Sequence, residues 1–254
     1  MKSSIKIETL TDRDLFRHRR ELAWRKSSAY WLNSPLRHVD DVGETIATRV
    51  EELCAQSSRS RPVVLDVGCG SGWLLAEMRR RAMSAFYIGV DSNRAFIEHC
   101  RSTFPKLPNI RFELVDLEKD EKSQRQLADV AVSSFVFFEL CDLNRGFLNV
   151  AKALRPRGRL LLSVIDKTYL LLALSHDWLD FRRKLRLYQT LPGTKYAFQP
   201  IDLGDSVSKT LVYPSVLYST QDYIDSAFRA GFTLCGYREE VFTAKAVGVD
   251  PTLT

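Results

Sequence analysis

The run from Pro62 to Leu75 (PVVLDVGCGSGWLL) constrains the fold of this chain more than any other stretch. Val63 to Val67 is apolar apart from Asp66, as in a strand buried on both faces of a parallel sheet. Three closely spaced glycines follow the strand: Gly68, Gly70 and Gly72. Glycine permits positive φ angles and lets a ligand lie against bare backbone. Because Leu74 to Arg81 then has the composition of a helix, the run predicts a strand, a tight turn and a helix, with a ligand over the strand's carboxyl end.

The spacing of the glycines separates several kinds of nucleotide-binding loop. No Gly-Lys-Ser/Thr follows, so the triphosphate-binding P-loop is excluded. The dinucleotide fingerprint requires its third glycine at position 73, which is Trp73. What remains is an acidic residue, Asp66, followed by glycines at every second position. This motif resembles the first motif of the class I S-adenosylmethionine-dependent methyltransferases.

Four later segments agree with that resemblance and keep the family's order. Phe86–Asp91 is a strand-like run with an acidic end about 25 positions after Asp66, and Ile110–Asp116 is a third such run. Asp129–Leu140 resembles the fourth strand with its active-site loop, and Leu154–Ser163 resembles a helix end, a turn and the fifth strand. Five motifs in order over residues 60–165 are far more specific than any one alone.

The alternation of strand and helix patterns between 62 and 165 predicts right-handed crossovers and a parallel sheet. We therefore expect an α/β fold with a Rossmann-like, doubly wound, mostly parallel sheet. The resemblance further implies an N-terminal helical lid and an inserted α+β substrate cover after the fifth strand. The expected division is a lid at 1–60, a cofactor-binding core at 61–166, a cover at 167–220, and a final helix and strands at 221–254. A sixth strand is expected at 233–242.

The resemblance implies S-adenosylmethionine as cofactor and assigns roles to residues of the matching motifs. The glycines approach the methionine moiety, Asp66 contacts its amino group through the loop, Asp91 holds the ribose, and Ser133 to Phe135 flank the sulfonium. Asp116 and Leu117 hold the adenine. The full set of expected cofactor residues is Asp66, Gly68, Cys69, Gly70, Gly72, Asp91, Ser92, Asp116, Leu117, Ser133, Ser134, Phe135, and Tyr30 and Arg37 of the lid.

Methyl transfer from a sulfonium requires in-line approach of a nucleophile, but neither a metal nor a covalent enzyme intermediate. No metal site is expected, and the five scattered cysteines have no Cys-x-x-Cys spacing. A hydroxyl or ammonium acceptor benefits from a nearby base. The weak candidates are His38, His176 and Glu139, with Asp166 also within reach of the expected pocket. For each, a purely structural role is an open alternative.

Absent motifs narrow the methyl acceptor. The fourth strand lacks the Asn/Asp-Pro-Pro-Tyr/Phe of enzymes that methylate planar amines, and no Pro-Cys dipeptide suggests a cytosine methyltransferase. A small-molecule acceptor, aromatic or anionic, is therefore favoured, with methylation at oxygen or nitrogen. A nucleic-acid partner and a membrane span are not expected; a cytosolic location is the default, and a homodimer stays open.

The net charge of +6 keeps other functions open. Residues 155–186 hold eight Lys or Arg against three acidic residues. This segment is either a solvated face or a contact for RNA, a protein or another anionic partner. The remaining alternative is a non-catalytic, cofactor-binding scaffold.

Overall fold

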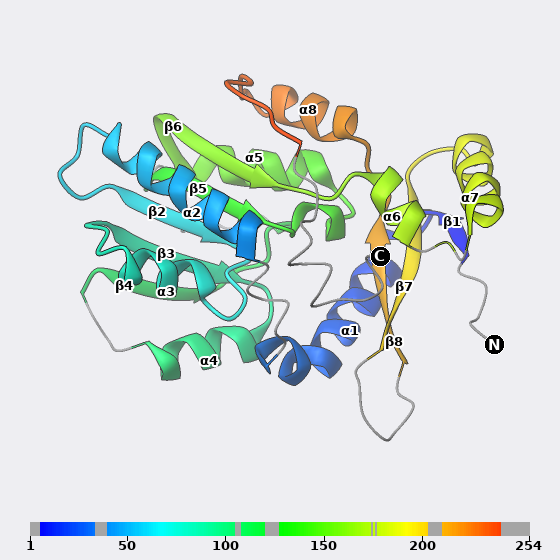
Figure 1. Ribbon diagram of the computed structural model, residues 1–254, viewed down its shortest axis with the longest axis horizontal. Coiled ribbons are helices and arrows are strands. Elements are labelled where there is room, and N and C mark those ends of the chain that lie inside the picture. The colour runs from blue at the N-terminus through cyan, green and yellow to red at the C-terminus, as the bar shows by residue number, and fades with distance from the viewer. Residues whose placement is uncertain are drawn as a thin grey trace.

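The structure, a computed structural model, describes residues 6–33, 40–104, 108–119, 127–173, 175, 177–202 and 210–239. Its central element is a parallel sheet with strands in the order β4-β3-β2-β5-β6 (Figure 1). The strands are β2 (Val63–Val67), β3 (Phe86–Asp91), β4 (Ile110–Leu114), β5 (Ala128–Ser134) and β6 (Leu154–Ser163). The chain changes direction beside β2, with β3 and β4 on one side and β5 and β6 on the other. Doubly wound sheets bind ligands at such a switch point. The strand order confirms the predicted Rossmann-like α/β fold.

Helices cover both faces of this sheet because strand side chains alternate between the faces. Val64 packs into a cluster with α2 (Asp40–Ala55), α3 (Trp73–Arg80) and α4 (Arg94–Thr103). Its neighbour Leu65 packs into the cluster on the other face, which includes residues of α5 (Leu143–Ala153) and α8 (Thr220–Arg229). The near-continuous apolar sequence of β2 is thus explained by burial on both sides.

A second, smaller sheet lies beyond the carboxyl ends of the core strands (Figure 1). It is antiparallel, in the order β1-β7-β8, and its strands are β1 (Ile7–Thr9), β7 (Lys195–Asp202) and β8 (Thr210–Val216). Two helices accompany it, α6 (Lys167–Ala173) and α7 (Trp178–Thr190). They share a small core that includes Ile7, Leu171, Phe181 and Leu217. The N-terminal strand was not expected, since residues 1–60 were predicted to be helical; it joins this segment of the chain to the sheet of the 167–220 insertion.

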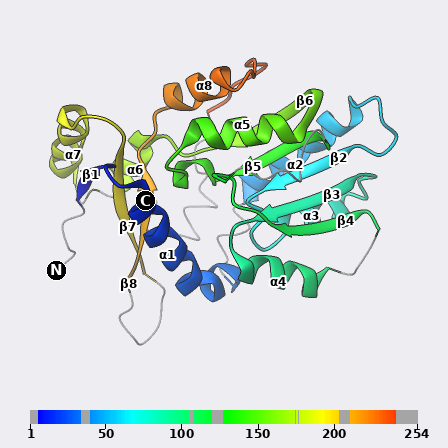
Figure 2. The same ribbon diagram turned by 180° about the vertical axis from the view of Figure 1, so that it is seen from behind.

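Helix α1 (Arg13–Asn33) lies between the two sheets (Figure 2). Its first turn is capped by Asp12, whose Oδ1 accepts a hydrogen bond from the Leu15 amide at 2.8 Å. The helix packs against both β8 and α4, which belong to different layers. It is therefore the element that connects the small sheet to the carboxyl ends of the core strands.

The expected sixth strand at 233–242 is not formed in its described part, because residues 232–239 have neither helix nor strand. Leu234 and Tyr237 are more than half exposed, so the segment gains little burial from lying against the core. Its contact with β6 is a hydrogen bond from Arg159 Nη1 to Cys235 Sγ at 3.0 Å, rather than a backbone ladder.

Among the described helices, none combines the length and apolar character that crossing a membrane requires. The basic segment 155–186 does not form one surface. Arg155 lies at the amino end of β6, where its Nε donates to the Leu127 carbonyl at 3.0 Å. Arg182, Arg183 and Arg186 lie on α7, at the opposite end of the molecule (Figures 1 and 2).

Candidate functional site

The glycine loop after β2 has the backbone geometry that its sequence predicts. Gly68, Gly70 and Gly72 all have positive φ angles, of 75°, 52° and 79°. The amides of Gly68 and Cys69 both donate to the Val90 carbonyl, at 2.8 and 3.0 Å, which ties the loop to β3. A Cβ on Gly68 would overlap Val136, whereas one on Gly70 would meet only open space. The loop thus presents bare backbone at Gly70 while it is packed tightly at Gly68.

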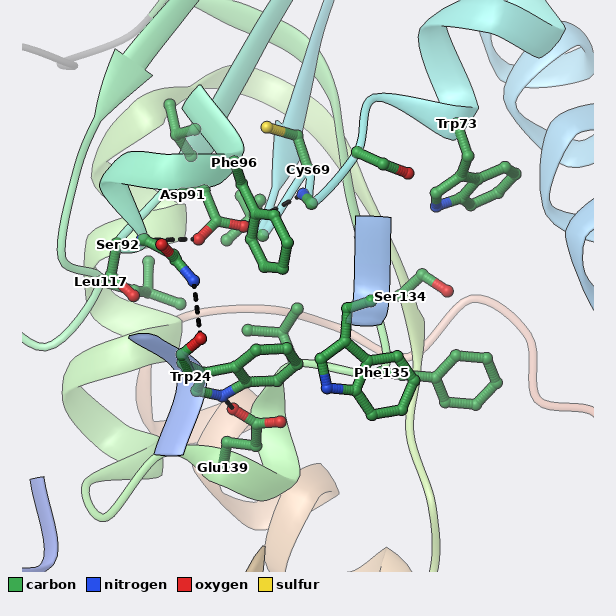
Figure 3. Close-up of a pocket in the computed structure, with 18 of the residues that line it drawn as sticks. Trp24, Cys69, Trp73, Asp91, Ser92, Phe96, Leu117, Ser134, Phe135 and Glu139 are labelled. Atoms are coloured by element: carbon green, nitrogen blue, oxygen red, sulfur yellow. Dashed lines mark hydrogen bonds between the residues drawn. The ribbon is translucent and has the colours of Figure 1, made fainter. Parts of the chain in front are cut away.

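A cavity of about 520 Å³ opens over this loop, at the carboxyl ends of β2, β3, β4 and β5 (Figure 3). Ten of the expected site residues line it: Gly68, Cys69, Gly70, Asp91, Ser92, Asp116, Leu117, Ser134, Phe135 and Glu139. Their convergence follows from the topology, since the carboxyl ends of parallel strands meet at one edge. Arg37, His38, His176 and the side chain of Tyr30 lie outside the described part of the structure.

Asp91 is fixed at the end of β3 by backbone donors. Its Oδ2 accepts from the Gly70 amide at 3.0 Å and its Oδ1 from the Asn93 amide at 2.8 Å. Burial raises the pKa of this carboxyl to about 6, against the opposing effect of these hydrogen bonds. Each oxygen has a further lone pair, so the side chain can accept two more hydrogen bonds from a ligand in the cavity.

Asp66 and Ser133 lie behind the wall of the cavity and do not line it. The Tyr87 hydroxyl donates to Asp66 Oδ2 at 2.5 Å, and Ser133 Oγ donates to the Val67 carbonyl at 3.0 Å. Burial raises the pKa of Asp66 to about 7. Asp66 is two residues after Val64 and so points to the same face of the sheet, toward α2 and α3. Gly72 also lies off the cavity, since a Cβ there would meet the Phe104 ring at 2.6 Å.

Asp116 lines the cavity, but its carboxylate already binds two groups of the turn that follows it. Oδ1 accepts from the Glu118 amide at 3.0 Å, and Oδ2 pairs with Lys119 Nζ at 3.1 Å. Although burial acts in the opposite direction, these two partners and nearby Arg20 lower the pKa of Asp116. The group is therefore ionised at neutral pH and is held in place independently of any ligand.

Glu139 is the carboxyl group that projects into the cavity from the turn after β5. The Trp24 indole Nε1–H of α1 donates to Glu139 Oε2 at 2.5 Å (Figure 3). Burial raises the pKa of Glu139 to about 8, and the Asp91 charge adds to this; the Trp24 hydrogen bond and Arg20 oppose it. The backbone nearby is strained, since Phe135 has a φ of 57° although it is not glycine. Such strain is typical of functional sites.

A buried ion pair beneath Glu139 holds α1 against the core. Arg20 Nη1 lies 2.7 Å from Glu118 Oε2 and also donates to the Glu139 carbonyl at 2.7 Å. Glu118 Oε1 accepts from the amides of Cys141 and Asp142, at 3.0 and 2.9 Å. One carboxylate therefore joins the helix to the turn that carries Glu139.

Sequence reasoning missed several cavity residues, mainly aromatic ones: Trp24, Trp73 and Phe96. The lid contact was expected around residues 30–38, and Trp31 does line the cavity, but Trp24 also enters it from two turns earlier in α1. Its ring lies 5.7 Å from that of Phe96, edge to face. Trp73 could have been found, because it directly follows the glycine loop and is the first residue of α3.

Comparison with known proteins agrees with this geometry. A family model described as a methyltransferase domain matches residues 37–197, more than half of the chain. A malonyl-[acyl-carrier protein] O-methyltransferase of Acetivibrio thermocellus is 26% identical over 80% of this chain and 76% of its own length. A ubiquinone biosynthesis O-methyltransferase of Rickettsia akari is 26% identical over 80% and 82%.

Among solved structures, an S-adenosylmethionine-dependent methyltransferase from Mesorhizobium loti matches with a TM-score of 0.57 and 22% identity. The match covers 85% of this chain and 92% of that one, and it supports the fold. The family match, the parallel sheet with its switch point and the glycine loop over a cavity lead to one assignment. The chain belongs to the methyltransferase domain family, as a class I S-adenosylmethionine-dependent methyltransferase.

Proposed function

We propose that this chain transfers a methyl group from S-adenosylmethionine to an oxygen of a small apolar or aromatic acceptor. The observation that carries the proposal is the position of Glu139. Its carboxyl projects into the cavity that the glycine loop opens onto, between aromatic side chains. A group with a pKa of about 8 is close to the operating pH of most enzymes, so it is suited to accepting a hydroxyl proton.

The described residues fit the cofactor. The open space at Gly70 accommodates the methionine moiety against bare backbone, and Asp91 has lone pairs for two ribose hydroxyls. Leu117 and Phe96 offer apolar surface to the adenine ring, while Ser134 and Phe135 flank the sulfonium. Asp66 and Ser133 support the loop and β5 from behind rather than contacting the ligand. When bound, S-adenosylmethionine supplies a methyl group that its positive sulfur has already activated.

The acceptor side of the cavity is assigned to Trp24, Trp31 and Glu139. Trp24 and Trp31 have ring centroids 5.8 Å apart and both line the cavity. Their faces would hold an apolar or aromatic acceptor by burial and stacking, and would exclude water from the reacting atoms. Glu139 then receives the proton as the acceptor oxygen attacks the methyl group, while Trp24 fixes the carboxyl's orientation.

The two relatives aligned over most of their length are named O-methyltransferases, one acting on a malonyl-[acyl-carrier protein] and one in ubiquinone biosynthesis. These names support oxygen over nitrogen as the atom methylated. We also assign residues 1–60 to a lid and 167–220 to a substrate cover. The packing of α1 against β8 and the pairing of β1 with β7 support closure of both as a single unit.

The test is a methylation assay with matched acceptors of one aromatic skeleton that carries a hydroxyl, a carboxylate or an amine. Products are identified by mass spectrometry, and S-adenosylhomocysteine release is measured from about pH 6 to 9. We expect turnover of the hydroxyl compound to rise with pH around the Glu139 pKa, and E139Q to lose most of that rate while it still binds cofactor. Turnover of the amine alone, or an unchanged rate in E139Q, would contradict the proposal.

A further inference from the structure

Helix α7 has a solvent-facing side that the fold does not use. Its inner side carries Phe181 and Lys184, which are buried, and packs against α6 and β1. Eight residues of its outer side are exposed: Trp178, Leu179, Arg182, Arg183, Arg186, Leu187, Gln189 and Thr190. They span half of the helix circumference at 100° per residue. A helix face that only contacts solvent usually carries charged and polar residues of both signs. Exposed tryptophan and leucine together with three arginines on one face therefore require an explanation.

Two of the three apolar members, Trp178 and Leu179, lie at the beginning of the helix. Trp178 is 67% exposed and Leu179 56%, and Leu172 at the end of the neighbouring α6 is 53% exposed. The Trp178 ring stacks on Phe181 with centroids 5.2 Å apart, which directs the indole while leaving most of it in water. A stacked and largely exposed tryptophan next to an exposed leucine in the sequence is typical of a surface that meets a partner.

The charged members follow one turn later. Within the described residues, no carboxylate lies within 4 Å of the guanidinium groups of Arg182, Arg183 or Arg186. The neighbouring Lys184 differs, since its Nζ lies 2.6 Å from Asp180 Oδ2. Asp177 caps the helix by accepting from the Asp180 amide at 2.8 Å. Three cations on the outer side of one helix therefore favour an anionic partner.

The position of α7 selects between two kinds of anionic partner. The helix lies at the outer end of the smaller sheet, on the side away from the core (Figures 1 and 2). Its 13 residues form a convex strip of roughly 20 by 10 Å. A folded acidic protein would bury about 800 Å² on each side of a specific interface, more than this strip offers. A lipid surface fits a convex helix, accepts tryptophan and leucine at headgroup depth, and binds arginine through its phosphates.

We propose that the outer side of α7 binds the surface of an anionic phospholipid membrane. Trp178 and Leu179 enter the headgroup region, and Arg182, Arg183 and Arg186 contact lipid phosphates. The binding is peripheral and reversible, since one short helix supplies both the apolar and the electrostatic part. It depends on neither the methyl acceptor nor the cofactor.

The test is co-sedimentation of the full chain with vesicles of phosphatidylcholine alone or with about 30% phosphatidylglycerol, at low and at high salt. We expect binding to the anionic vesicles at low salt and release at high salt. Each arginine near an anionic surface is worth about fivefold in binding, so R182Q/R183Q/R186Q should bind on the order of a hundredfold more weakly. W178S changes no charge, so it should weaken binding by removing the apolar contribution of the indole, and this loss should be present at low salt.

The matched control is R25Q/K26Q/R229Q, which removes the same charge from exposed residues of α1 and α8 and should bind as the wild type does. Cofactor titration of each variant verifies that it is folded. Absence of wild-type binding to the anionic vesicles would overturn the proposal, and would point to an acidic protein as the partner of this helix. Equal losses in the control variant would also overturn it, because binding would then follow net charge rather than α7.

Discussion

The replacement E139Q tests whether the buried carboxyl of the cavity is protonated in the folded protein. A glutamine at this position keeps an oxygen for the Trp24 indole and has no titration of its own. The folded-state pKa of Glu139 is about 8 and its ordinary value is 4.5, so the native state keeps a proton that the unfolded state has lost. The stability that this proton provides is complete below about pH 4.5 and disappears as pH rises toward 8. As pH rises, the wild type should therefore lose more stability than E139Q does.

The magnitude follows from the shift. One pH unit changes the free energy of unfolding by about 1.4 kcal/mol in the window between the two pKa values. From about pH 5.5 to 7.5, wild type should then lose roughly 2.7 kcal/mol relative to E139Q. Urea unfolding followed by far-ultraviolet circular dichroism at several pH values measures this difference. Asp66 and Asp91 also have raised pKa values and act in the same direction, but they are present in both proteins.

The charge-matched control for this experiment is E98Q, at an exposed position of α4. Its pH profile of stability should run parallel to that of the wild type. If the E139Q profile also runs parallel to the wild-type profile, Glu139 is not protonated in the native state and the proposed base is ionised throughout. Ligand binding should show a related effect, because an ionised Glu139 attracts the cationic S-adenosylmethionine but not the neutral S-adenosylhomocysteine. The affinity for S-adenosylmethionine relative to S-adenosylhomocysteine should therefore rise with pH in the wild type and not in E139Q.

Three further substitutions test the construction of the site. In calorimetric titrations, D91A should bind S-adenosylmethionine on the order of a hundredfold more weakly, since hydrogen bonds to a charged group are worth about 1.5–3 kcal/mol each; unchanged affinity would remove Asp91 from the site. G68A should mainly lower stability in urea, by about 2 kcal/mol or more, whereas G70A should mainly lower cofactor affinity; the reverse pattern would contradict the geometry of the loop. R20M should cost about 3–5 kcal/mol in urea unfolding, because Glu118 is left charged in the interior, and R20M/E118Q should recover part of it.

The core sheet could be predicted because its signals are local. Strands such as β2 and β3 are short apolar runs that end near a glycine or an acidic residue, and Asp91 and Asp116 follow directly from such boundaries. The strand β1 could not be predicted, since Ile7–Thr9 is too short for a periodic pattern and pairs with a strand almost 190 positions away. The direction of Asp66, toward α2 and α3, follows from its alternation with Val64 along the strand.

The contacts between α1 and the cavity show why part of a site escapes sequence reasoning. Trp24 meets Glu139 across 115 positions, and on sequence alone it is an aromatic residue in an arginine-rich helix. The part of α1 that carries Trp24 is held by a group remote in sequence: Asn93 Nδ2 donates to the Trp24 carbonyl at 3.4 Å and to Ser28 Oγ at 3.0 Å.

The same contacts couple the helix to the ligand. Asn93 is two residues from Asp91, and its backbone N–H donates to that carboxylate. Its side chain donates to Ser28 of α1. Glu118 binds Arg20 of the helix and the turn that carries Glu139. A ligand that orders Asp91 or the Glu139 turn therefore also stabilises the docked helix, and by linkage the docked helix raises the affinity for that ligand. Because β1 directly precedes α1 and pairs with β7 of the smaller sheet, cofactor binding and closure of the proposed cover are expected to be one coupled event rather than two.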